Sequence, residues 1–205
     1  FVLDIFRLTA DQKHVYDLPY YYNGHFISSS FAYDKNVSRL EPMGPRNGYQ
    51  HLWKEATGFP EGRFMQLCWL ENKQFYTLST AVSTPCTPYL VKTGANDPDY
   101  NLVTRNGMLL RTSSPVANHT YVSVIEPHGS YDLVTETTRN AESEIAELTI
   151  LHDADDYTFI RITTKQGKHL LFAVVNSGYD TKRRHTFLLG PERFEWTGNY
   201  ALFNK

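Results

Sequence analysis

The feature that most constrains the fold is a series of short apolar runs that recur from Arg63 onward, each bounded by turn-forming residues. Short runs rich in Val, Ile, Thr, Tyr and Phe are typical of β-strands. We predict strands at residues 64–70, 74–82, 89–93, 102–111, 120–126, 144–151, 158–164, 169–175 and 186–189. Many short strands at regular spacing indicate an all-β fold, either a sandwich or a barrel.

Residues 102–111 contain the pair Asn106-Gly107, which indicates a bulge or a tight hairpin inside that run. No run has a clear helical period over three turns. Residues 141–147 come nearest to a helix, and they read equally well as a loop that leads into a strand.

The N-terminal part of the chain adds two more strand-like runs, residues 2–8 and 15–22. Pro19 interrupts the second run, and because proline lacks a ladder donor we place this strand at a sheet edge. Asn23-Gly24 is a strong two-residue hairpin signal. It predicts that residues 25–33 return as the partner strand, with His25 across from Tyr22.

Residues 34–49 are rich in Pro, Gly and Asn, so we expect a loop there, followed by an ambiguous short segment at 50–55. A chain of 205 residues can bury a core without disulfides, and we place no boundary within residues 1–205. Cys68 and Cys86 are too few for a disulfide framework and lack metal-site spacing. They allow one bridge or two free thiols, and we favour free thiols.

The formal net charge of −2 gives no basic field that would point to nucleic acid or to an anionic membrane. No apolar run approaches the ~18 residues of a membrane span, and no signal peptide is present. Because Phe1 opens within an apolar run, we expect the chain to be cut from a longer protein. Sequons at Asn36 and Asn118 matter only in a secreted eukaryotic protein.

His14, Tyr16 and Asp17 share one predicted strand or its approach, where a period of two puts His14 and Tyr16 on one face and Asp17 on the other. This pattern fits a surface histidine beside structural tyrosines at least as well as a site. A zinc site built from His14, His25 and His51 has suitable ligands, but the spacings match no strong metal signature.

The run Arg46 to His51 is a second candidate, because a loop arginine can fork onto a carboxylate and the phenol of Tyr49 can exchange a proton. A turn with a packed tyrosine is the simpler interpretation. Asp97 fits an Asx turn better than a calcium ligand. Glu126 and His128 fit a strand-ending turn better than a catalytic pair. Walker, GxSxG and CxxC motifs are absent from the sequence.

Several segments, in this order and spacing, resemble the C-terminal β-domain of oligoalginate lyases, which are heparinase II/III-type polysaccharide lyases. They are LDIFRL, HVYDLPYYYNGHFI, NGYQHLW, GANDPDYNL, MLLR and VSVIEPHGSYD. The specific motifs lie between Phe1 and Asp132. The resemblance implies a large antiparallel β-sandwich that partners an N-terminal α/α toroid of the same protein, with the cleft between the two.

The resemblance also implies the reaction, a β-elimination on an acidic polysaccharide or oligosaccharide, most specifically alginate. A base removes the C5 proton, the bond to O4 breaks, and an unsaturated uronate remains. The C5 proton becomes acidic only when the neighbouring carboxylate is neutralised, so hydrogen-bond donors must face that group. The chemistry needs no cofactor, and a polymer substrate implies a periplasmic or secreted enzyme.

By the same resemblance, His14 matches a histidine that reaches into the cleft, as a proton-transfer or charge-neutralising partner. Tyr49 matches the assisting or orienting tyrosine of the NGYQHLW motif. We predict His14 and Tyr49 as catalytic, and Arg46 and His51 as substrate-binding, with Arg46 resting on position and chemistry alone. The family's principal tyrosine and its neutralising pair belong to the helical domain, so this chain alone should be an incomplete catalyst.

One departure concerns metal. Many relatives carry His-x-His where this chain has His14-Val15-Tyr16, and the second histidine there helps to hold a structural zinc. Tyr16 puts that zinc in doubt, although a metal could be held elsewhere. Two other functions stay open: a lyase of the same fold acting on a glycosaminoglycan, and a non-catalytic carbohydrate-binding sandwich.

Overall fold

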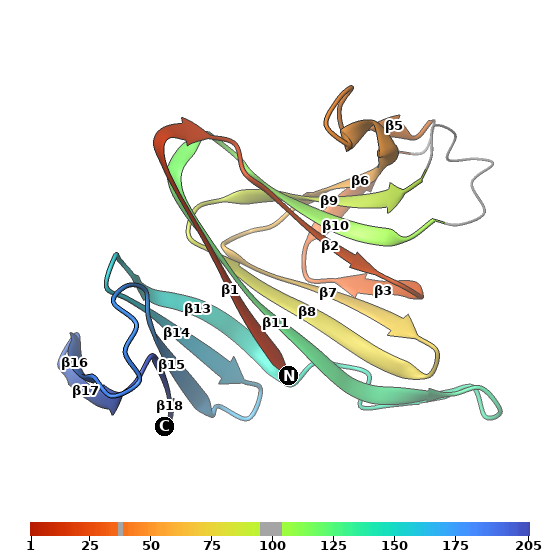
Figure 1. Ribbon diagram of the computed structural model, residues 1–205. Helices are drawn as coiled ribbons and strands as arrows, with labels where there is room; N and C mark the ends of the chain where they lie inside the picture. Colours follow the sequence, from red (N-terminus) through yellow and green to blue (C-terminus); the bar gives the residue numbers. More distant parts are fainter. Residues whose placement is uncertain (37–38, 95–103) are drawn as a thin grey trace. The chain divides into compact units, whose positions relative to one another are not determined.

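The computed structural model describes residues 1–36, 39–94 and 104–205. The predicted loop that contains Asp97 and the last two positions of the Asn36 sequon lie outside these residues. The described chain is built from antiparallel strands and one short 3₁₀ turn, which confirms the all-β class (Figure 1). It forms two compact units, Phe1–Ser143 and Glu144–Lys205. We predicted no boundary at this point, and a single domain over 1–205 stays a prediction.

The first unit contains two antiparallel sheets. Sheet A has the order β1 (Val2–His14), β11 (Val116–Asp132), β8 (Gln74–Val82), β7 (Phe64–Glu71) and β3 (His25–Ser29), with β12 (Thr137–Arg139) on β11. Sheet B has the order β2 (Asp17–Tyr22), β10 (Asn106–Thr112), β9 (Cys86–Thr93), β6 (Leu52–Phe59) and β4 (Ala32–Lys35), with β5 (Glu41–Pro42) on β6.

The two sheets share one apolar core, as expected of a β-sandwich. Met65 and Leu67 of β7, Met108 and Leu110 of β10, and Tyr121 of β11 belong to one buried cluster. Alternate residues of each strand point into this cluster, so the intervening residues of sheet B point to its outer face. Burial of such side chains is the main stabilising contribution to the sandwich.

The expected hairpin at Asn23-Gly24 is wrong. Strand β2 pairs with β10 in sheet B, whereas β3 pairs with β7 in sheet A, so His25 lies opposite Leu70 and not opposite Tyr22. Gly24 has a φ of 87°, and a Cβ there would lie 2.1 Å from the carbonyl oxygen of Leu70. The pair therefore carries the chain from one sheet to the other, where only glycine fits.

Three further sequence predictions have clear outcomes. Strand β2, which contains Pro19, lies at an edge of sheet B as predicted, because the missing donor of proline needs no partner there. The helix candidate at 141–147 instead leads into strand β13 (Ile145–Asp153). Asn106-Gly107 opens β10 in regular register with β2 and β9, so it makes neither a bulge nor a hairpin.

The predicted strand and loop limits near the N-terminus also need correction. Strand β1 extends to His14, beyond the predicted end at residue 8, with a register shift between Thr9 and His14. The expected loop at 34–49 holds the short strand β5, and the ambiguous segment that follows it is a 3₁₀ turn leading into β6.

The second unit has its own core. Strands β13, β14 (Tyr157–Thr164), β15 (His169–Val175) and β18 (Tyr200–Asn204) form one sheet, and β16 (Arg184–Leu189) pairs with β17 (Glu192–Thr197). Phe159, Phe194 and Trp196 lie in its buried cluster together with aliphatic side chains of β15. Strands β17 and β18 were not predicted: in β17 charged and polar residues surround the buried Phe194 and Trp196, and β18 has exposed and half-buried residues only.

Two other expectations can be compared with the structure. Cys68 and Cys86 are both free and buried, which confirms the preference for free thiols. Within the described residues there is no helix with the length and apolar character needed to cross a membrane.

Candidate functional site

An ion pair between two neighbouring strands is the centre of the candidate site. Asp17 opens β2 directly opposite Arg111 of β10. The guanidinium donates two hydrogen bonds to the carboxylate, from Nε to Oδ1 at 2.8 Å and from Nη2 to Oδ2 at 2.7 Å. The Asp17 side chain is only 9% exposed and that of Arg111 29%. This bidentate geometry is the strong form of the interaction and holds both side chains in place.

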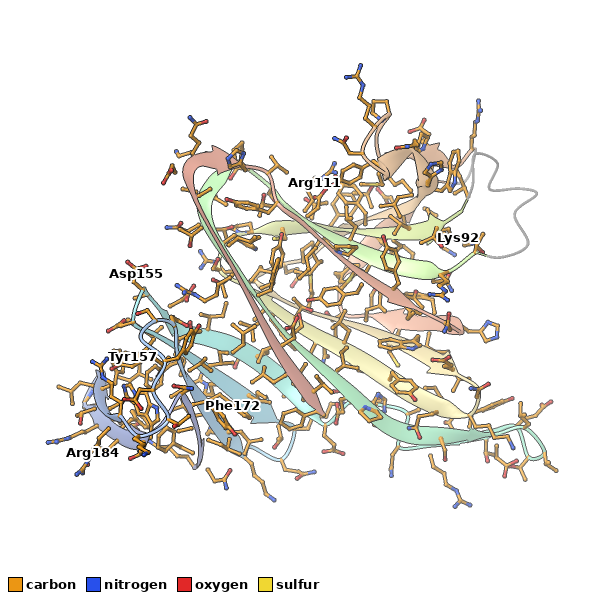
Figure 2. All side chains as sticks on the ribbon, in the orientation of Figure 1. Lys92, Arg111, Asp155, Tyr157, Phe172 and Arg184 are labelled. Carbon is orange, nitrogen blue, oxygen red and sulfur yellow. The ribbon has the colours of Figure 1, made fainter. Side chains whose placement is uncertain are left out.

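The pair lies on the outer face of sheet B. Met108 and Leu110 of β10 point into the core, so the alternate positions Leu109 and Arg111 face away from it. Leu109 is nevertheless only 1% exposed, because this face is covered. Figure 2 places Arg111 at the edge of the first unit where β10 and β9 run side by side.

Tyr49 reaches this face from the loop between β4 and β6. It opens the 3₁₀ turn Tyr49–His51, which follows two residues of positive φ, Asn47 at 59° and Gly48 at 87°. Its hydroxyl donates a hydrogen bond of 2.5 Å to Oδ2 of Asp17. The loop is therefore fastened to the sheet by the phenol that the sequence motif singled out.

Two aromatic rings flank the guanidinium. Cζ of Arg111 lies 5.6 Å from the ring centroid of Tyr49 and 5.7 Å from that of Tyr89 in β9. These distances suit cation–π attraction, which adds to the carboxylate contacts. We call Asp17, Tyr49, Tyr89 and Arg111 the outer cluster.

The electrostatics of the outer cluster keep the phenol protonated. Burial raises the pKa of Tyr49, and the hydrogen bond and charge of Asp17 raise it further, against a smaller opposing effect of Arg111. The hydrogen bonds to Asp17 raise the pKa of Arg111, which therefore stays charged. At neutral pH the cluster holds a neutral phenol, whose hydrogen is donated to Asp17, beside a fixed carboxylate–guanidinium pair.

His14 lies close to this cluster in sequence but belongs to another element. It is exposed at the end of β1, and its ring centroid lies 6.1 Å from that of Tyr16. Asp17, three residues later, begins the next strand in the other sheet. The solvent-exposed imidazole is accessible to a ligand, and its predicted catalytic role stays a prediction.

Arg46 and His51 flank Tyr49 and are both exposed. Their backbone shapes the turn: the carbonyl of Arg46 accepts from the Tyr49 amide at 3.1 Å, and the His51 amide donates to Gly48 at 3.0 Å. Neither side chain joins the outer cluster, where Arg111 is the arginine that contacts a carboxylate. Their predicted substrate-binding roles stay predictions.

From the sequence, Asp17 was singled out only as a neighbour of His14, and no role was predicted for Tyr89 or Arg111. Each is a polar or aromatic residue at a position that alternates with core residues, which is a weak signal shared by many surface residues. The decisive fact is the pairing of β2 with β10, which joins residues 94 apart in sequence.

Glu126 and His128 are not a mutual pair. The carboxylate of Glu126 accepts a hydrogen bond from Ser143, while His128 contacts the Thr77 hydroxyl at 2.8 Å and the Asn140 carbonyl at 3.0 Å. Strand β11 continues past both residues, so the expected turn at this point is also wrong.

The residues near His14 do not fit the zinc site that the resemblance suggests. Tyr16 replaces the second histidine, donates its hydroxyl to the carbonyl of Ala117 at 2.9 Å, and packs against the core. Across residues 1–36, 39–94 and 104–205, no three His, Cys, Asp or Glu side chains gather as a metal-binding group. A structural zinc elsewhere stays a prediction.

Comparison with known proteins gives a consistent result. No protein-family profile matches the chain. The chain is 32% identical over 204 residues to an alginate lyase of Stenotrophomonas maltophilia, and 32% identical over 200 residues to an exo-oligoalginate lyase of Saccharophagus degradans. These matches cover 100% and 96% of this chain but 27% of each relative. The similarity to alginate-cleaving lyases that the motifs predicted is thereby confirmed, and the chain spans about a quarter of the length of these relatives.

Proposed function

We propose that this chain is the β-sandwich part of a polysaccharide lyase that cleaves alginate, or oligosaccharides derived from it, by β-elimination. The observation that carries the proposal is the relationship to two alginate-cleaving enzymes along the whole chain. Because the chain spans 27% of each relative, we propose that a helical toroid of the same protein supplies the other wall of the cleft.

The outer cluster suits one part of this reaction. β-Elimination needs a base at C5, neutralisation of the uronate carboxylate, and a proton donor for the departing O4. Tyr49 keeps its proton at neutral pH and donates it in a hydrogen bond to Asp17, so we assign its hydroxyl oxygen to orient or assist the sugar by accepting a hydrogen bond. Asp17 and Arg111 are positioning residues, since they hold the phenol without needing to touch the substrate.

Three exposed groups outside the outer cluster complete the proposal. We assign His14 to proton transfer or to neutralisation of the carboxylate, and Arg46 and His51 to substrate binding. All three are exposed, so a sugar chain can reach them. No step requires a metal ion from this chain. We further propose that the intact protein acts in the periplasm or outside the cell, where polymeric substrate is accessible.

The test is a lyase assay of the intact protein on alginate, hyaluronan and heparin. Elimination creates a C=C bond conjugated with the carboxylate, so product is followed by ultraviolet absorbance. We expect absorbance to rise with alginate and not with the other two polymers. Product from hyaluronan or heparin alone would replace the alginate proposal by a glycosaminoglycan lyase. If the protein binds alginate but forms no product, the remaining interpretation is a non-catalytic carbohydrate-binding module.

A pair of histidine variants tests the site within that assay. His14→Ala should lower turnover on alginate, because we assign the imidazole to proton transfer or to neutralisation of the carboxylate. His169→Ala is the matched control, since His169 is also exposed but lies in the second unit. Equal turnover in the two variants would remove His14 from the proposed site.

A further inference from the structure

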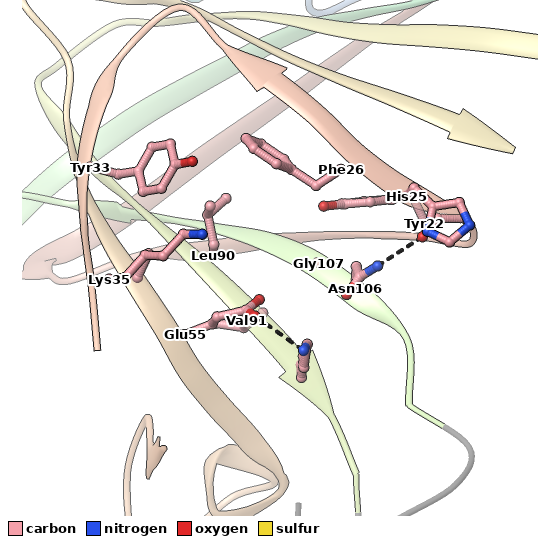
Figure 3. A pocket seen from close by; sticks show the side chains of 13 residues that line it. Tyr22, His25, Phe26, Tyr33, Lys35, Glu55, Leu90, Val91, Asn106 and Gly107 are labelled. Carbon is pink, nitrogen blue, oxygen red and sulfur yellow. Dashed lines mark hydrogen bonds and ion pairs between the residues drawn. The ribbon is translucent and has the colours of Figure 1, made fainter. Parts of the chain in front are cut away.

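A pocket of about 280 Å³ opens in the first unit and shares no residue with the outer cluster. It lies where the far ends of β2, β10 and β9 meet β3, β4 and β6 (Figure 3). Its floor is apolar, formed by Ala56 and Leu90. Binding pockets for drug-sized molecules begin near 300 Å³, so this volume suits a smaller ligand such as a single sugar ring.

The rim of the pocket carries polar groups from separate strands. Tyr22, Asn106 and Lys92 are partners in register across β2, β10 and β9, so their side chains share one face. Lys35 is in register with Ala56, and Figure 3 shows Lys35 and Tyr33 on one side, with His25 and Asn106 on the other. Groups that are distant in sequence therefore converge on one space.

The charges at the rim leave one cation without a partner. Lys92 is paired with Glu55 at 3.0 Å, and Asn106 donates to the carbonyl of Gly24 at 2.9 Å. The side chain of Lys35 makes no ion pair or hydrogen bond with any residue in the described ranges. Because the neighbouring pair is neutral, the ammonium of Lys35 gives the pocket a net positive character suited to a carboxylate.

Two tyrosine hydroxyl groups of the pocket can form hydrogen bonds to a ligand. The hydroxyl groups of Tyr22 and Tyr33 accept and donate no hydrogen bond within the part of the chain that the structure describes. The ring of Tyr33 packs edge-on against Phe26, with centroids 5.8 Å apart. The two rings form an apolar wall against which the C–H groups of a sugar ring can pack. An apolar wall with a few convergent polar groups is the usual composition of a small-molecule site.

We infer that this pocket is a second, non-catalytic binding site for a hydroxylated carboxylate of the size of one sugar acid, with Lys35 on the carboxylate and Tyr22 and Tyr33 on hydroxyl groups. The choice of a sugar acid rests on the proposed function, whereas the preference for a carboxylate rests on the charges of the pocket.

The test measures binding of D-mannuronate to the intact protein by isothermal titration, with D-mannose as the uncharged analogue. Losing a charge-assisted hydrogen bond should weaken mannuronate binding by about tenfold in Lys35→Met. Lys182→Met, an exposed lysine of the second unit, is the matched control and should bind as wild type does. Tyr22→Phe should weaken both sugars to a similar extent.

Three results would overturn the inference: no binding of mannuronate, an unchanged Kd in Lys35→Met, or mannose binding as tight as mannuronate binding. Turnover on alginate, measured on the same samples, should be unchanged in Lys35→Met. If the wild type cleaves no alginate but binds mannuronate in a Lys35-dependent way, the proposed function fails and the pocket stands. If it cleaves alginate but Lys35→Met binds normally, only the pocket fails.

Discussion

The first unit contains two polar clusters in contrasting surroundings. Around His119 of β11, which is only 1% exposed, every polar contact is internal. Its Nδ1 lies 2.7 Å from the hydroxyl of Thr84 and its Nε2 3.6 Å from Sγ of Cys86. Burial lowers the pKa of His119 to about 4 and raises that of Cys86 to about 12, so both groups stay neutral. The outer cluster instead retains the charges of Asp17 and Arg111 as a pair.

The difference separates a structural role from a chemical one. The His119 cluster combines a histidine and a cysteine, which by residue type alone would suggest a nucleophile and its base. Both are buried, and the thiol is kept from ionising, so the cluster serves to satisfy polar groups in the core. In the outer cluster Tyr49 is held by a fixed ion pair and remains partly exposed, which leaves it within reach of a substrate.

The largest stability effect should come from the outer cluster. Arg111→Met leaves the largely buried Asp17 carboxylate without its cation. Breaking such a pair should lower the free energy of unfolding by about 3 kcal/mol, measured by urea denaturation. Arg184→Met is the matched control, because Arg184 pairs with Glu195 at 2.6 Å while 74% exposed, and its loss should cost under about 1 kcal/mol. Equal losses of unfolding free energy in Arg111→Met and Arg184→Met would contradict the burial of the Asp17–Arg111 pair.

The His119 cluster should respond to pH with a somewhat smaller effect. The folded-state pKa of His119, about 4, lies below the ordinary histidine value of 6.5, so the unfolded chain binds the proton first as the pH falls. Stability is therefore complete above about pH 6.5 and declines as the pH falls toward 4, with about 2 kcal/mol lost between pH 7 and pH 5. Urea denaturation at both pH values measures the loss.

The control for this pH effect is His119→Gln, which keeps a polar side chain but cannot titrate. The difference in unfolding free energy between pH 7 and pH 5 should shrink in this variant by the same amount. His169→Gln, at an exposed position, should keep the wild-type difference. If His119→Gln also keeps the wild-type difference in unfolding free energy between pH 7 and pH 5, a group other than His119 causes the pH dependence.

Tyr49→Phe should have the smallest effect on stability. It removes one hydrogen bond, but Asp17 keeps both contacts from Arg111, so no charge is left unpaired. The loss in unfolding free energy should be about 1 kcal/mol. Tyr200→Phe, at a residue 75% exposed, should change nothing measurable. A loss in Tyr49→Phe as large as in Arg111→Met would mean that the phenol is mainly structural.

Local patterns in the sequence were enough to predict most strands and the all-β class. Residues 74–82 and 169–175, for example, alternate or concentrate β-branched and aromatic side chains and are strands in the structure. Turn-forming residues were less informative about which strands pair with each other. Asn23-Gly24 has the composition of a hairpin turn, and yet it connects two different sheets. Register between distant strands depends on the whole core and not on the local residues.

The candidate site shows the same limit. Tyr49 could be identified from its motif, but Asp17 and Arg111 become partners only through the pairing of two strands far apart in sequence. Arg46 was the arginine chosen from proximity in the chain, whereas a strand places Arg111 beside the phenol. Residue type and spacing therefore drew attention to Tyr49 but did not identify the residues that contact it.

The most direct test of the central claim is the turnover number of the Tyr49→Phe variant of the intact protein on alginate, with Tyr200→Phe measured beside it. If Tyr49 acts on the substrate, losing its hydroxyl group should reduce turnover by about 100-fold or more while the protein stays folded. Turnover equal to that of wild type in a folded Tyr49→Phe protein would contradict the assignment of the outer cluster to the lyase site.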